Sequence, residues 1–311
     1  MAAIDDLANR VLKNQRHLRK WARREDIEAY RLYDRDMPEF PLTVDRYRDW
    51  LHVQVFERRR PLTETDIGDI RERLAEALEI PRPQLVVKHR RRQRGLEQYQ
   101  KLETPTPSFT VRERGLRFEV NMGRYLDTGL FIDHRDTRQR VRAQAAGKTF
   151  LNLFAYTGSF TVYAAAGGAR RTVTVDMSKT YQDWSRRNLV HNRLADGARH
   201  SFVQSDVQAF LQRMRGSGAR FDLIVLDPPS FSNSKRMRTS FDVQRDHPAL
   251  LRTTLELLAP GGMLYFSNNR QGFRMDPVAG ELAEVCEITD QTIPPDCRRH
   301  RPHRCWTLTR P

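Results

Sequence analysis

From residue 149 onward, apolar stretches of strand length alternate with stretches of helical length, and this alternation restricts the fold more than any other feature of the chain. The predicted strands are residues 149–154, 171–175, 201–204, 221–226 and 263–267, and the predicted helices are residues 159–166, 180–192, 207–214 and 243–258. Glycines at 167–168, 216 and 261–262 stand where helices are expected to end. Repetition of this kind predicts an α/β, Rossmann-like fold with a mostly parallel, doubly wound sheet.

A smaller α/β domain is predicted before this alternation. Residues 7–21 predict an amphipathic first helix that either packs on the domain or binds RNA, and the next predicted elements are strands, one helix and a short strand, at 29–33, 42–47, 50–56, 63–78 and 85–88. Like charges at 90–94 and prolines at 105 and 107 predict a linker. We therefore expect domains at 1–110 and 111–311, the second opening with a hairpin formed by 116–121 and 130–133.

The charge of the chain favours a polyanionic partner. Its 311 residues carry a formal net charge of +15, and neutralised phosphates release counterions, which adds affinity for nucleic acid. Only seven of the 54 basic residues are lysine, so the arginine excess is equally consistent with codon usage in a GC-rich genome. Charge alone leaves this question open.

Cysteine usage and hydropathy predict a cytoplasmic protein that does not span a membrane. Three cysteines near the end of the chain, Cys286, Cys297 and Cys305, lack the paired spacing of a disulfide framework. No stretch approaches the length of a membrane span, and no signal peptide is expected. His300, His303 and Cys305 offer three candidate ligands without a fourth, and residues 305–308 read as a final core strand, so we expect no metal site.

Small and acidic residues follow the predicted strands, at the edge where a doubly wound sheet binds ligands. Gly158 follows the first strand and would let backbone approach a ligand closely, although an ordinary strand-to-helix turn would look similar. Asp176 follows the second strand, 22 residues beyond Phe154, a separation typical of an acidic residue that binds the ribose of an adenosine cofactor. Asp206 follows the third strand and would either face the adenine or cap the next helix.

The fourth strand ends in Asp227, Pro228, Pro229, Ser230 and Phe231. The two prolines stiffen the backbone and remove its amide donors, so that carbonyl groups and the Asp227 carboxylate would face a flat base, on which Phe231 would stack. A plain rigid turn is the alternative. A dinucleotide oxidoreductase would instead need Gly-x-Gly-x-x-Gly after the first strand, and that pattern is absent.

Longer stretches resemble the class I S-adenosylmethionine-dependent methyltransferases that modify large-subunit ribosomal RNA, and in particular the guanine-N7 methyltransferase half of fused bacterial 23S rRNA enzymes. The matching stretches are residues 30–34, 44–47, 98–102, 125–135, 152–159, 231–237, 241–247 and 266–269. Ala155 and Ser230 are mild departures from the pattern.

The resemblance implies S-adenosylmethionine as cofactor and assigns residues to its parts. The loop after the first strand would wrap the methionine part, through Asn152, Phe154, Tyr156, Thr157, Gly158 and Ser159. The ribose would bind Asp176, and the adenine would lie near Met177 and Asp206. The cofactor-side wall would include Asp133, His134 and Arg135. The target base would meet Asp227, Pro228, Pro229 and Phe231, and Asp227 would also border the cofactor.

The resemblance further implies 23S rRNA or its precursor as substrate. Phosphate contacts are expected from Lys235, Arg236 and Arg238 and from Arg90, Arg91 and Arg92, the alternatives being a solvated loop and an exposed linker. Fused relatives carry a second methyltransferase half with an RNA-binding THUMP domain, which this sequence does not include. We therefore expect RNA capture by the basic surface of the chain itself or by a partner that supplies additional RNA binding.

Guanine N7 carries an in-plane lone pair and can accept a methyl group without losing a proton, so no general base is required and catalysis can come mainly from orientation. Cytosine-C5 methylation needs a cysteine thiolate, whereas the chain reads Phe266-Ser267-Asn268-Asn269 after the fifth strand. Two alternatives stay open. One is methylation of an exocyclic amine, which an Asp-Pro-Pro-aromatic loop also suits, and the other is a noncatalytic RNA-binding or RNA-remodelling module.

Overall fold

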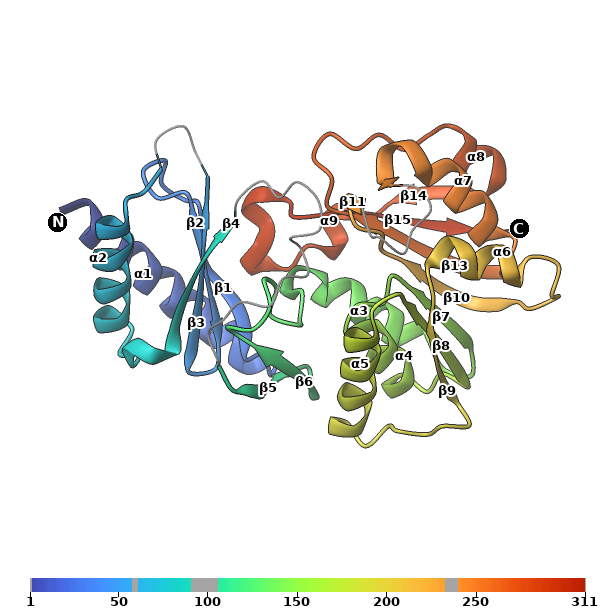
Figure 1. Ribbon diagram of the computed structural model, residues 1–311, viewed down its shortest axis with the longest axis horizontal. Helices are drawn as coiled ribbons and strands as arrows, with labels where there is room; N and C mark the ends of the chain where they lie inside the picture. The colour runs from blue at the N-terminus through green and yellow to red at the C-terminus, as the bar shows by residue number, and fades with distance from the viewer. Residues whose placement is uncertain (1, 58–60, 91–105, 233–239, 311) are drawn as a thin grey trace. The chain divides into compact units, whose positions relative to one another are not determined.

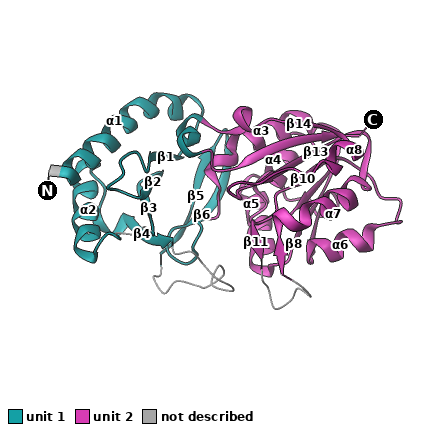
Figure 2. Cartoon of the chain, turned by 90° about the horizontal axis from the view of Figure 1, so that it is seen from above, with its two compact units in different colours: residues 1–128, 295–300 teal, residues 129–294, 301–311 magenta. Residues whose placement is uncertain are grey.

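A computed structural model describes residues 2–57, 61–90, 106–232 and 240–310. The chain forms two compact units, one of residues 1–128 and 295–300 and the other of residues 129–294 and 301–311 (Figure 2). This division lies beyond the boundary expected near residue 110, because the hairpin of β5 (Ser108–Glu113) and β6 (Leu116–Asn121) associates with the first unit. Glu113 forms a bridge with Ile27, and the Arg112 carbonyl accepts a hydrogen bond from the amide of Glu28.

The first unit is built on a four-stranded sheet with the order β1-β2-β3-β4. Its elements are α1 (Ala2–Arg24), β1 (Ala29–Asp34), β2 (Leu42–Tyr47), β3 (Trp50–Phe56), α2 (Glu64–Ala77), the 3-10 helix η1 (Arg82–Gln84) and β4 (Leu85–Arg90). The first three strands are antiparallel, and α2 makes the crossover that brings β4 parallel to β3. Thr63 and Asp66 begin α2 with a reciprocal capping box.

A segment from late in the chain completes this unit. The 3-10 helix η4 (Pro295–His300) contributes Asp296, whose carboxylate accepts a 2.9 Å hydrogen bond from the backbone amide of Arg31. Arg299 donates to the carbonyl of Asp36 at 3.0 Å. These contacts explain why residues 295–300 belong with the N-terminal sheet despite their distance in sequence.

The second unit contains, among the described residues, a seven-stranded sheet with the order β14-β15-β13-β10-β7-β8-β9. The strands β7 (Thr149–Leu153), β8 (Arg171–Asp176), β9 (His200–Gln204), β10 (Phe221–Leu226) and β13 (Leu258–Asn268) are parallel. The strands β15 (Arg304–Thr309) and β14 (Glu284–Glu287) extend the sheet with antiparallel pairings, β13 to β15 and β15 to β14. The predicted doubly wound α/β sheet is confirmed, and so is the final core strand at 305–308.

Helices cover both faces of this sheet (Figure 1). One face packs α3 (Arg135–Gln144), α4 (Ser159–Ala166) and α5 (Lys179–His191), and the other packs α6 (Val207–Met214), α7 (Val243–Leu255) and α8 (Val278–Leu282). Neighbouring strand residues divide between the two cores: Phe150 packs with α3 and α4, whereas Leu151 packs with α6 and α7. Because successive side chains of a strand point to opposite faces of the sheet, each strand contributes residues to the hydrophobic cores on both faces.

The predicted pairing of residues 116–121 with 130–133 is wrong. Strand β6 pairs with β5 through a tight turn at Arg114 and Gly115, both with positive φ. Gly129, with a φ of 101°, instead turns the chain into the 3-10 helix η3 (Ile132–His134) that precedes α3. A short apolar run does not distinguish a strand from such a turn.

Within the described ranges, no helix combines the length and apolar character needed to cross a membrane.

Candidate active site

The second unit has a topological switch point between β7 and β10. From β7 the chain proceeds outward through β8 to β9, and then returns to place β10 on the other side of β7 and β13 beyond it. Loops diverge at such a point and leave a crevice at the carboxyl ends of the strands. The loop that follows Leu153 and the loop that follows Leu226 flank this crevice.

The loop after β7 has an unusual backbone. Phe154, Tyr156 and Gly158 have φ values of 56°, 50° and 72°, so every second residue is left-handed. Only glycine adopts this region without strain, and a Cβ at position 158 would lie 2.6 Å from the hydroxyl oxygen of Ser185. Gly158 is thus required by conformation and by space, as the N-terminal boundary of α4.

Side chains of α5 hold this loop. The Ser185 hydroxyl donates to the Tyr156 carbonyl at 3.2 Å, and the Asn188 amide donates to the Thr157 carbonyl at 2.9 Å. Thr157 in turn donates to the carbonyl of Gly129 at 2.6 Å. These hydrogen bonds offset the strain of the left-handed residues and fix the loop before a ligand arrives.

Asp176, the last residue of β8, faces the loop. Its carboxylate accepts hydrogen bonds from the backbone amides of Tyr156 at 2.9 Å and Ser178 at 2.8 Å. Burial raises the pKa of Asp176 to about 6, and the two hydrogen bonds offset part of that rise. The carboxyl group is therefore positioned at the crevice with unused acceptor capacity.

Asp227 lies on the other side of the crevice, directly after β10. The Ser267 hydroxyl donates to its Oδ1 at 2.6 Å, and the side chain remains 24% exposed. Next to Ser267, the Asn268 side chain is buried, and its Nδ2 has no hydrogen-bond partner among the described residues. A buried amide donor of this kind is costly unless a ligand satisfies it.

Phe231 presents its ring to solvent, with 45% of the residue exposed. It begins β11 (Phe231–Ser232), which pairs with β12 (Phe241–Asp242). The Ser230 hydroxyl donates to the side-chain oxygen of Asn269 at 2.6 Å, which ties this loop to the end of β13. Pro228 and Pro229 connect the ring to Asp227 through a stiff backbone.

Comparison with known proteins gives the family. A family model described as S-adenosylmethionine-dependent methyltransferase matches residues 33–288. The chain belongs to this methyltransferase family.

Curated relatives match along nearly the whole methyltransferase. "Ribosomal RNA large subunit methyltransferase K" of Neisseria meningitidis is 48% identical and is covered to 88%, with 99% of this chain aligned. "Ribosomal RNA large subunit methyltransferase K/L" of Pseudomonas putida is 50% identical over 97% of this chain, which spans 41% of that longer protein. The corresponding protein of Stutzerimonas stutzeri is 51% identical, with 42% of its length covered.

Solved structures agree with the fold. A putative methyltransferase complexed with SAH aligns over 98% of this chain and 81% of its own, with a TM-score of 0.76 and 24% identity. A methyltransferase from Agrobacterium tumefaciens aligns over 91% of this chain and 89% of its own, with a TM-score of 0.63 and 18% identity. The class I architecture predicted from the sequence is therefore confirmed.

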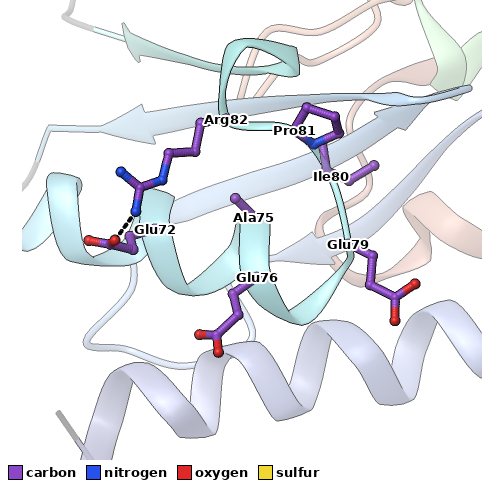
Figure 3. A pocket seen from close by; sticks show the side chains of 7 residues that line it. All are labelled: Glu72, Ala75, Glu76, Glu79, Ile80, Pro81 and Arg82. Carbon is purple, nitrogen blue, oxygen red and sulfur yellow. Dashed lines mark hydrogen bonds and ion pairs between the residues drawn. The ribbon is translucent and has the colours of Figure 1, made fainter.

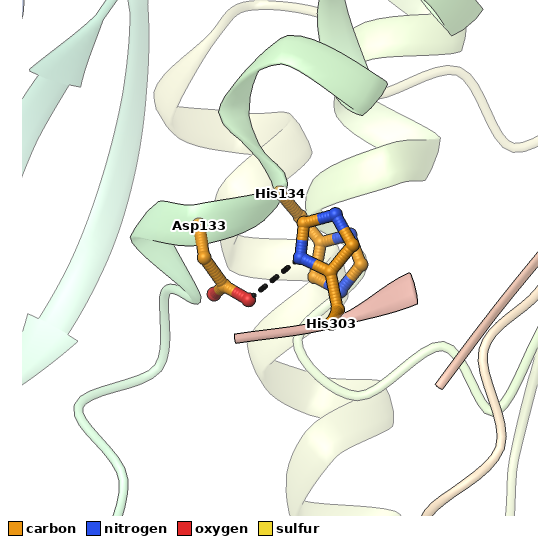
Figure 4. A group of neighbouring side chains, drawn as sticks. All are labelled: Asp133, His134 and His303. Carbon is orange, nitrogen blue, oxygen red and sulfur yellow. Dashed lines mark hydrogen bonds and ion pairs between the residues drawn. The ribbon is translucent and has the colours of Figure 1, made fainter. Parts of the chain in front are cut away.

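The methyltransferase has a stacked pair of histidines, His134 and His303, next to Asp133 (Figure 4). The rings of His134 and His303 stack with centroids 4.1 Å apart and planes at 15°, and His303 Nδ1 lies 3.0 Å from the carboxylate of Asp133. His134 Nε2 lies 3.6 Å from Asp227 Oδ2, and its Nδ1 is buried with no partner among the described residues. Burial, followed by the neighbouring His303, lowers the pKa of His134 to about 4, so this ring is neutral near pH 7.

Ligand atoms of Asp133, His134 and His303 all lie within 4.8 Å of one another. The two rings are nearly parallel, so their in-plane lone pairs do not converge on one point, and both nitrogens of His303 already contact oxygens, of Asp133 and Thr292. These contacts favour a stacked histidine pair, in which His303 is hydrogen-bonded to Asp133 and Thr292, over a metal centre.

The other sequence-predicted residues differ in what the structure shows of them. Asp206 caps α6 by accepting the amide of Ala209 at 2.9 Å, so the capping role is confirmed and the adenine role stays a prediction. Met177 and Ser159 are half-buried, next to Asp176 and Gly158 respectively. Asn152 is buried and donates to the Thr161 hydroxyl at 3.0 Å, beneath the loop. The Arg135 side chain is fully buried at the start of α3.

The basic residues proposed for RNA are only partly described. Lys235, Arg236, Arg238, Arg91 and Arg92 lie outside the described residues. The guanidinium of Arg90 donates to the Gln54 side chain at 2.7 Å and pairs with Asp127, so a phosphate contact by Arg90 would have to exchange these partners.

Sequence reasoning missed several contributors to the crevice. Phe131 is 40% exposed, with its ring centroid 5.1 Å from that of Tyr156, and Tyr181 packs edge-on against Tyr156 at 4.6 Å. The spacing of Tyr181, Ser185 and Asn188 places them on one face of a helix, a signal available in the sequence. The sequence offered His303 only as a candidate metal ligand, and it gave no sign of the contact with Asp133, which lies 170 residues earlier in the chain.

A hollow in the first unit contains none of the predicted site residues. It lies around the C-terminal end of α2 and is lined by Glu72, Ala75, Glu76, Glu79, Ile80, Pro81 and Arg82 (Figure 3). Its carboxylates make it a poor site for a phosphate-bearing ligand.

Proposed function

We propose that this methyltransferase transfers a methyl group from S-adenosylmethionine to guanine N7 of 23S ribosomal RNA or its precursor. The observation that carries the proposal is the 48% identity to large-subunit rRNA methyltransferase K, extending over 99% of this chain and 88% of that relative. The aligned region includes the loop after β7 and the loop after β10, which flank the crevice, as well as the strands and helices of the fold.

The residues at the carboxyl edge fit S-adenosylmethionine. Asp176 presents a carboxylate with free acceptor sites where ribose hydroxyls would donate. The loop of Phe154, Tyr156, Thr157 and Gly158 would surround the methionine part, and Met177 and Asp206 the adenine. When bound, S-adenosylmethionine supplies an electrophilic methyl group on a positively charged sulfur.

Asp227 would select the base by its hydrogen-bonding edge. One carboxylate oxygen accepts the Ser267 hydroxyl, and the carboxylate retains acceptor sites for the N1–H and N2–H donors of guanine. Adenine and cytosine do not present this pair of donors. The unpartnered Nδ2 of Asn268 is a further donor near the crevice, and the exposed ring of Phe231 would stack on the flipped base.

The protein would act by orientation and not by proton removal. Guanine N7 is nucleophilic as it stands, and aligned reactants can account for roughly 7–11 kcal/mol of barrier reduction. His134, the histidine beside Asp227, is neutral near pH 7 because its pKa is lowered to about 4. It would keep the crevice wall uncharged while Asp227 engages the base.

Of two competing chemistries, one conflicts with the residues of the site and the other stays a second candidate. Cytosine-C5 methylation needs a thiolate, but Cys305 is buried and its pKa is raised by that burial, and residues 266–269 contain no cysteine. Exocyclic-amine methylation is compatible with an Asp-Pro-Pro turn followed, after Ser230, by the aromatic Phe231, and it is the second candidate. It would yield a different modified nucleoside, so one measurement separates the two.

The proposal includes a cytoplasmic location, because ribosomal RNA of bacteria is made and assembled there. It also includes a partner protein that supplies additional RNA binding. The proposed phosphate contacts in this chain are Lys235, Arg236 and Arg238, which follow Phe231 in the sequence, and Arg90, Arg91 and Arg92.

Mass mapping of 23S rRNA tests the proposal. In cells that lack the gene, one N7-methylguanosine should be lost, and purified protein with S-adenosylmethionine should restore it on that RNA. Loss of an N2-methylated guanosine would favour the exocyclic-amine alternative. An unchanged methyl profile, together with no binding of S-adenosylmethionine at millimolar concentration, would leave the noncatalytic module as the better reading.

A further inference from the structure

Helix α1 is amphipathic, and its apolar face is fully used. Leu7, Ala8, Val11 and Ala22 are buried in the core of the first unit, with Leu18 and Trp21 packed against that core. In Figure 1 the helix lies along the sheet of the first unit next to α2. No apolar stripe of this helix is left to insert into a membrane, which membrane-surface helices require.

The opposite face of α1 is cationic. Between Asp6 and Glu25 the sequence contains no acidic residue. The exposed cations of this stretch are Arg10, Lys13, Arg16, Arg19, Lys20, Arg23 and Arg24. Arg10 lies 3.9 Å from Asp36, and Arg24 lies 3.5 Å from Glu25. The other five make no ion pair within the described part of the chain.

These five cations form a continuous surface, which we name the α1 basic face: Lys13, Arg16, Arg19, Lys20 and Arg23. The spacing of three and four residues aligns Lys13, Arg16, Lys20 and Arg23 along one side of the helix. At 1.5 Å per residue they extend over about 15 Å, a length that can follow several successive phosphates of a nucleic-acid strand.

The neighbouring helix carries the opposite charge. Exposed acidic residues lie along α2 and just beyond it, at Glu64, Asp69, Glu72, Glu76 and Glu79. Figure 3 shows the last three, with Glu72 paired to Arg82. Glu76 pairs with Arg73. The ion pairs of Glu72 and Glu76 are therefore made with arginines that do not belong to α1. A surface kept only for solubility would intersperse both signs, whereas residues 7–24 of α1 carry positive charges alone. Helix α2 is acidic in balance, with Arg71 and Arg73 among its acidic residues.

We propose that the α1 basic face binds the phosphate backbone of the RNA substrate. The choice of RNA as the polyanion rests on the proposed function, whereas the cationic surface itself does not. Long side chains without carboxylate partners can exchange their counterions for phosphates at little cost. Contacts of this kind add affinity without reading sequence, so the face would serve substrate capture and not base selection.

The test is RNA binding by a charge-neutralised full-length protein. The variant carries Lys13→Gln, Arg16→Gln, Lys20→Gln and Arg23→Gln, because glutamine removes the charge while keeping an unbranched polar side chain of similar helix propensity. Binding to a fluorescein-labelled transcript of 23S rRNA is followed by anisotropy at several salt concentrations. We expect Kd to rise roughly tenfold to hundredfold at 0.1 M salt, and the slope of log K against log salt to fall by about 3.

A matched control removes the same charge elsewhere. Arg171, Arg193, Arg213 and Arg220 are exposed residues of the second unit that lie at or near the amino ends of its parallel strands, opposite the crevice. Replacement of these four arginines by glutamine should change the Kd for the transcript by less than about threefold. Calorimetric binding of S-adenosylhomocysteine should be unchanged in both variants, which reports that the second unit is folded. Amide hydrogen exchange of residues 1–128 should also be unchanged in the α1 variant, which reports that the first unit is folded.

Equal losses in both quadruple variants would overturn the proposal, because the effect would then follow net charge and not the α1 face. An unchanged Kd and salt slope in the α1 variant would also overturn it. Exchange of each lysine for arginine and each arginine for lysine should preserve binding, and loss in that variant would contradict a phosphate-contact role.

Kinetics separate this proposal from the proposed function. With methyl transfer measured on the same transcript, the α1 variant should raise KM and leave kcat within twofold. If wild-type protein binds the transcript but methylates no guanine N7, the proposed function fails and the binding comparison still decides the α1 face. If methylation occurs and both proteins bind equally, only the inference about α1 fails.

Discussion

At the scale of single residues, Asp227 has the most specific environment in the crevice. Its position after β10, the hydrogen bond from Ser267 and its partial exposure leave carboxylate acceptor sites unused and open to solvent. The sequence predicted this residue from the two prolines that follow it. The contribution of Ser267 was not predicted, because the pairing of β10 with β13 is needed to bring the two side chains together.

Replacing Asp227 should abolish methyl transfer and spare the cofactor. Asp227→Ala removes both acceptors for the guanine edge, and Asp227→Asn replaces one of them by a donor, so we expect kcat to fall by roughly 100-fold or more in each variant. Calorimetric Kd for S-adenosylhomocysteine should stay within threefold. Ser267→Ala keeps the carboxylate and should have a smaller effect on kcat. Retained turnover in Asp227→Ala would refute the base-orienting role.

Asp176 predicts a pH dependence of cofactor binding. Its pKa in the protein is about 6, and ribose hydroxyls would favour the ionised carboxylate, so binding should release a proton near pH 6. The affinity for S-adenosylhomocysteine should therefore weaken as pH falls through 6, by up to about tenfold at pH 5. Titration calorimetry in buffers of different ionisation enthalpy measures both effects. Asp176→Asn should bind weakly and without this pH dependence, and a wild-type affinity that is flat between pH 5 and 7.5 would contradict the assignment.

At the scale of elements, the turn between β7 and α4 could be predicted from the sequence, whereas its backbone conformation could not. Gly158 indicated a tight turn. The left-handed conformations of Phe154 and Tyr156 have no sequence signature, since neither residue favours them. The hydrogen bonds from α5 that stabilise them depend on tertiary packing. The same holds for residues 130–133, where a local apolar pattern predicted a strand and the chain instead forms a turn into α3.

Gly158→Ala should destabilise the second unit and weaken cofactor binding. The new Cβ would meet the Ser185 side chain at 2.6 and 2.7 Å, in addition to the strain of a φ of 72°. We expect a loss of about 2–4 kcal/mol in the free energy of unfolding. Gly216→Ala is the matched control, since its φ is 75° and no atom lies within 4 Å of the added Cβ, so only about 1 kcal/mol should be lost. Equal losses in the two variants by denaturant titration would show that the contact with Ser185 is unimportant.

At the scale of the whole molecule, the alternation of strands and helices could be predicted from the sequence, whereas the return of residues 295–300 to the first unit could not. Alternating strands and helices were sufficient to predict the five parallel strands of the second unit, because hydrophobic periodicity follows directly from burial, whereas β14 was not predicted. The return of residues 295–300 to the first unit depends on the contacts of Asp296 with Arg31 and of Arg299 with Asp36. Contacts between residues so distant in sequence leave no periodic signal.

The buried histidines predict how the two units respond to acid. Burial lowers the pKa of His52 in the first unit and of His134 in the second, the latter to about 4. In the unfolded chain each histidine has a pKa near 6.5. As pH falls below 6.5 the unfolded state gains a proton that the folded state does not, so stability is lost down to the folded pKa. For His134 this loss amounts to about 3 kcal/mol by pH 4.

Asp176 acts in the opposite direction within the second unit. Its raised pKa means that the folded state holds a proton more tightly, which stabilises that unit as pH falls from about 6 towards 3.8. Because the effects of Asp176 and His134 oppose each other, the pH profile of the wild type alone would hide both of them.

His134→Gln should gain stability relative to wild type as pH falls from 6.5 to 4, with no change of that difference above pH 7.5. Amide hydrogen exchange, read by mass spectrometry for each unit separately, should show the gain in residues 129–294 and not in residues 1–128, whereas His52→Gln should show the reverse. A difference between His134→Gln and wild type that stays constant from pH 7.5 to 4 would mean that His134 titrates normally in the folded protein.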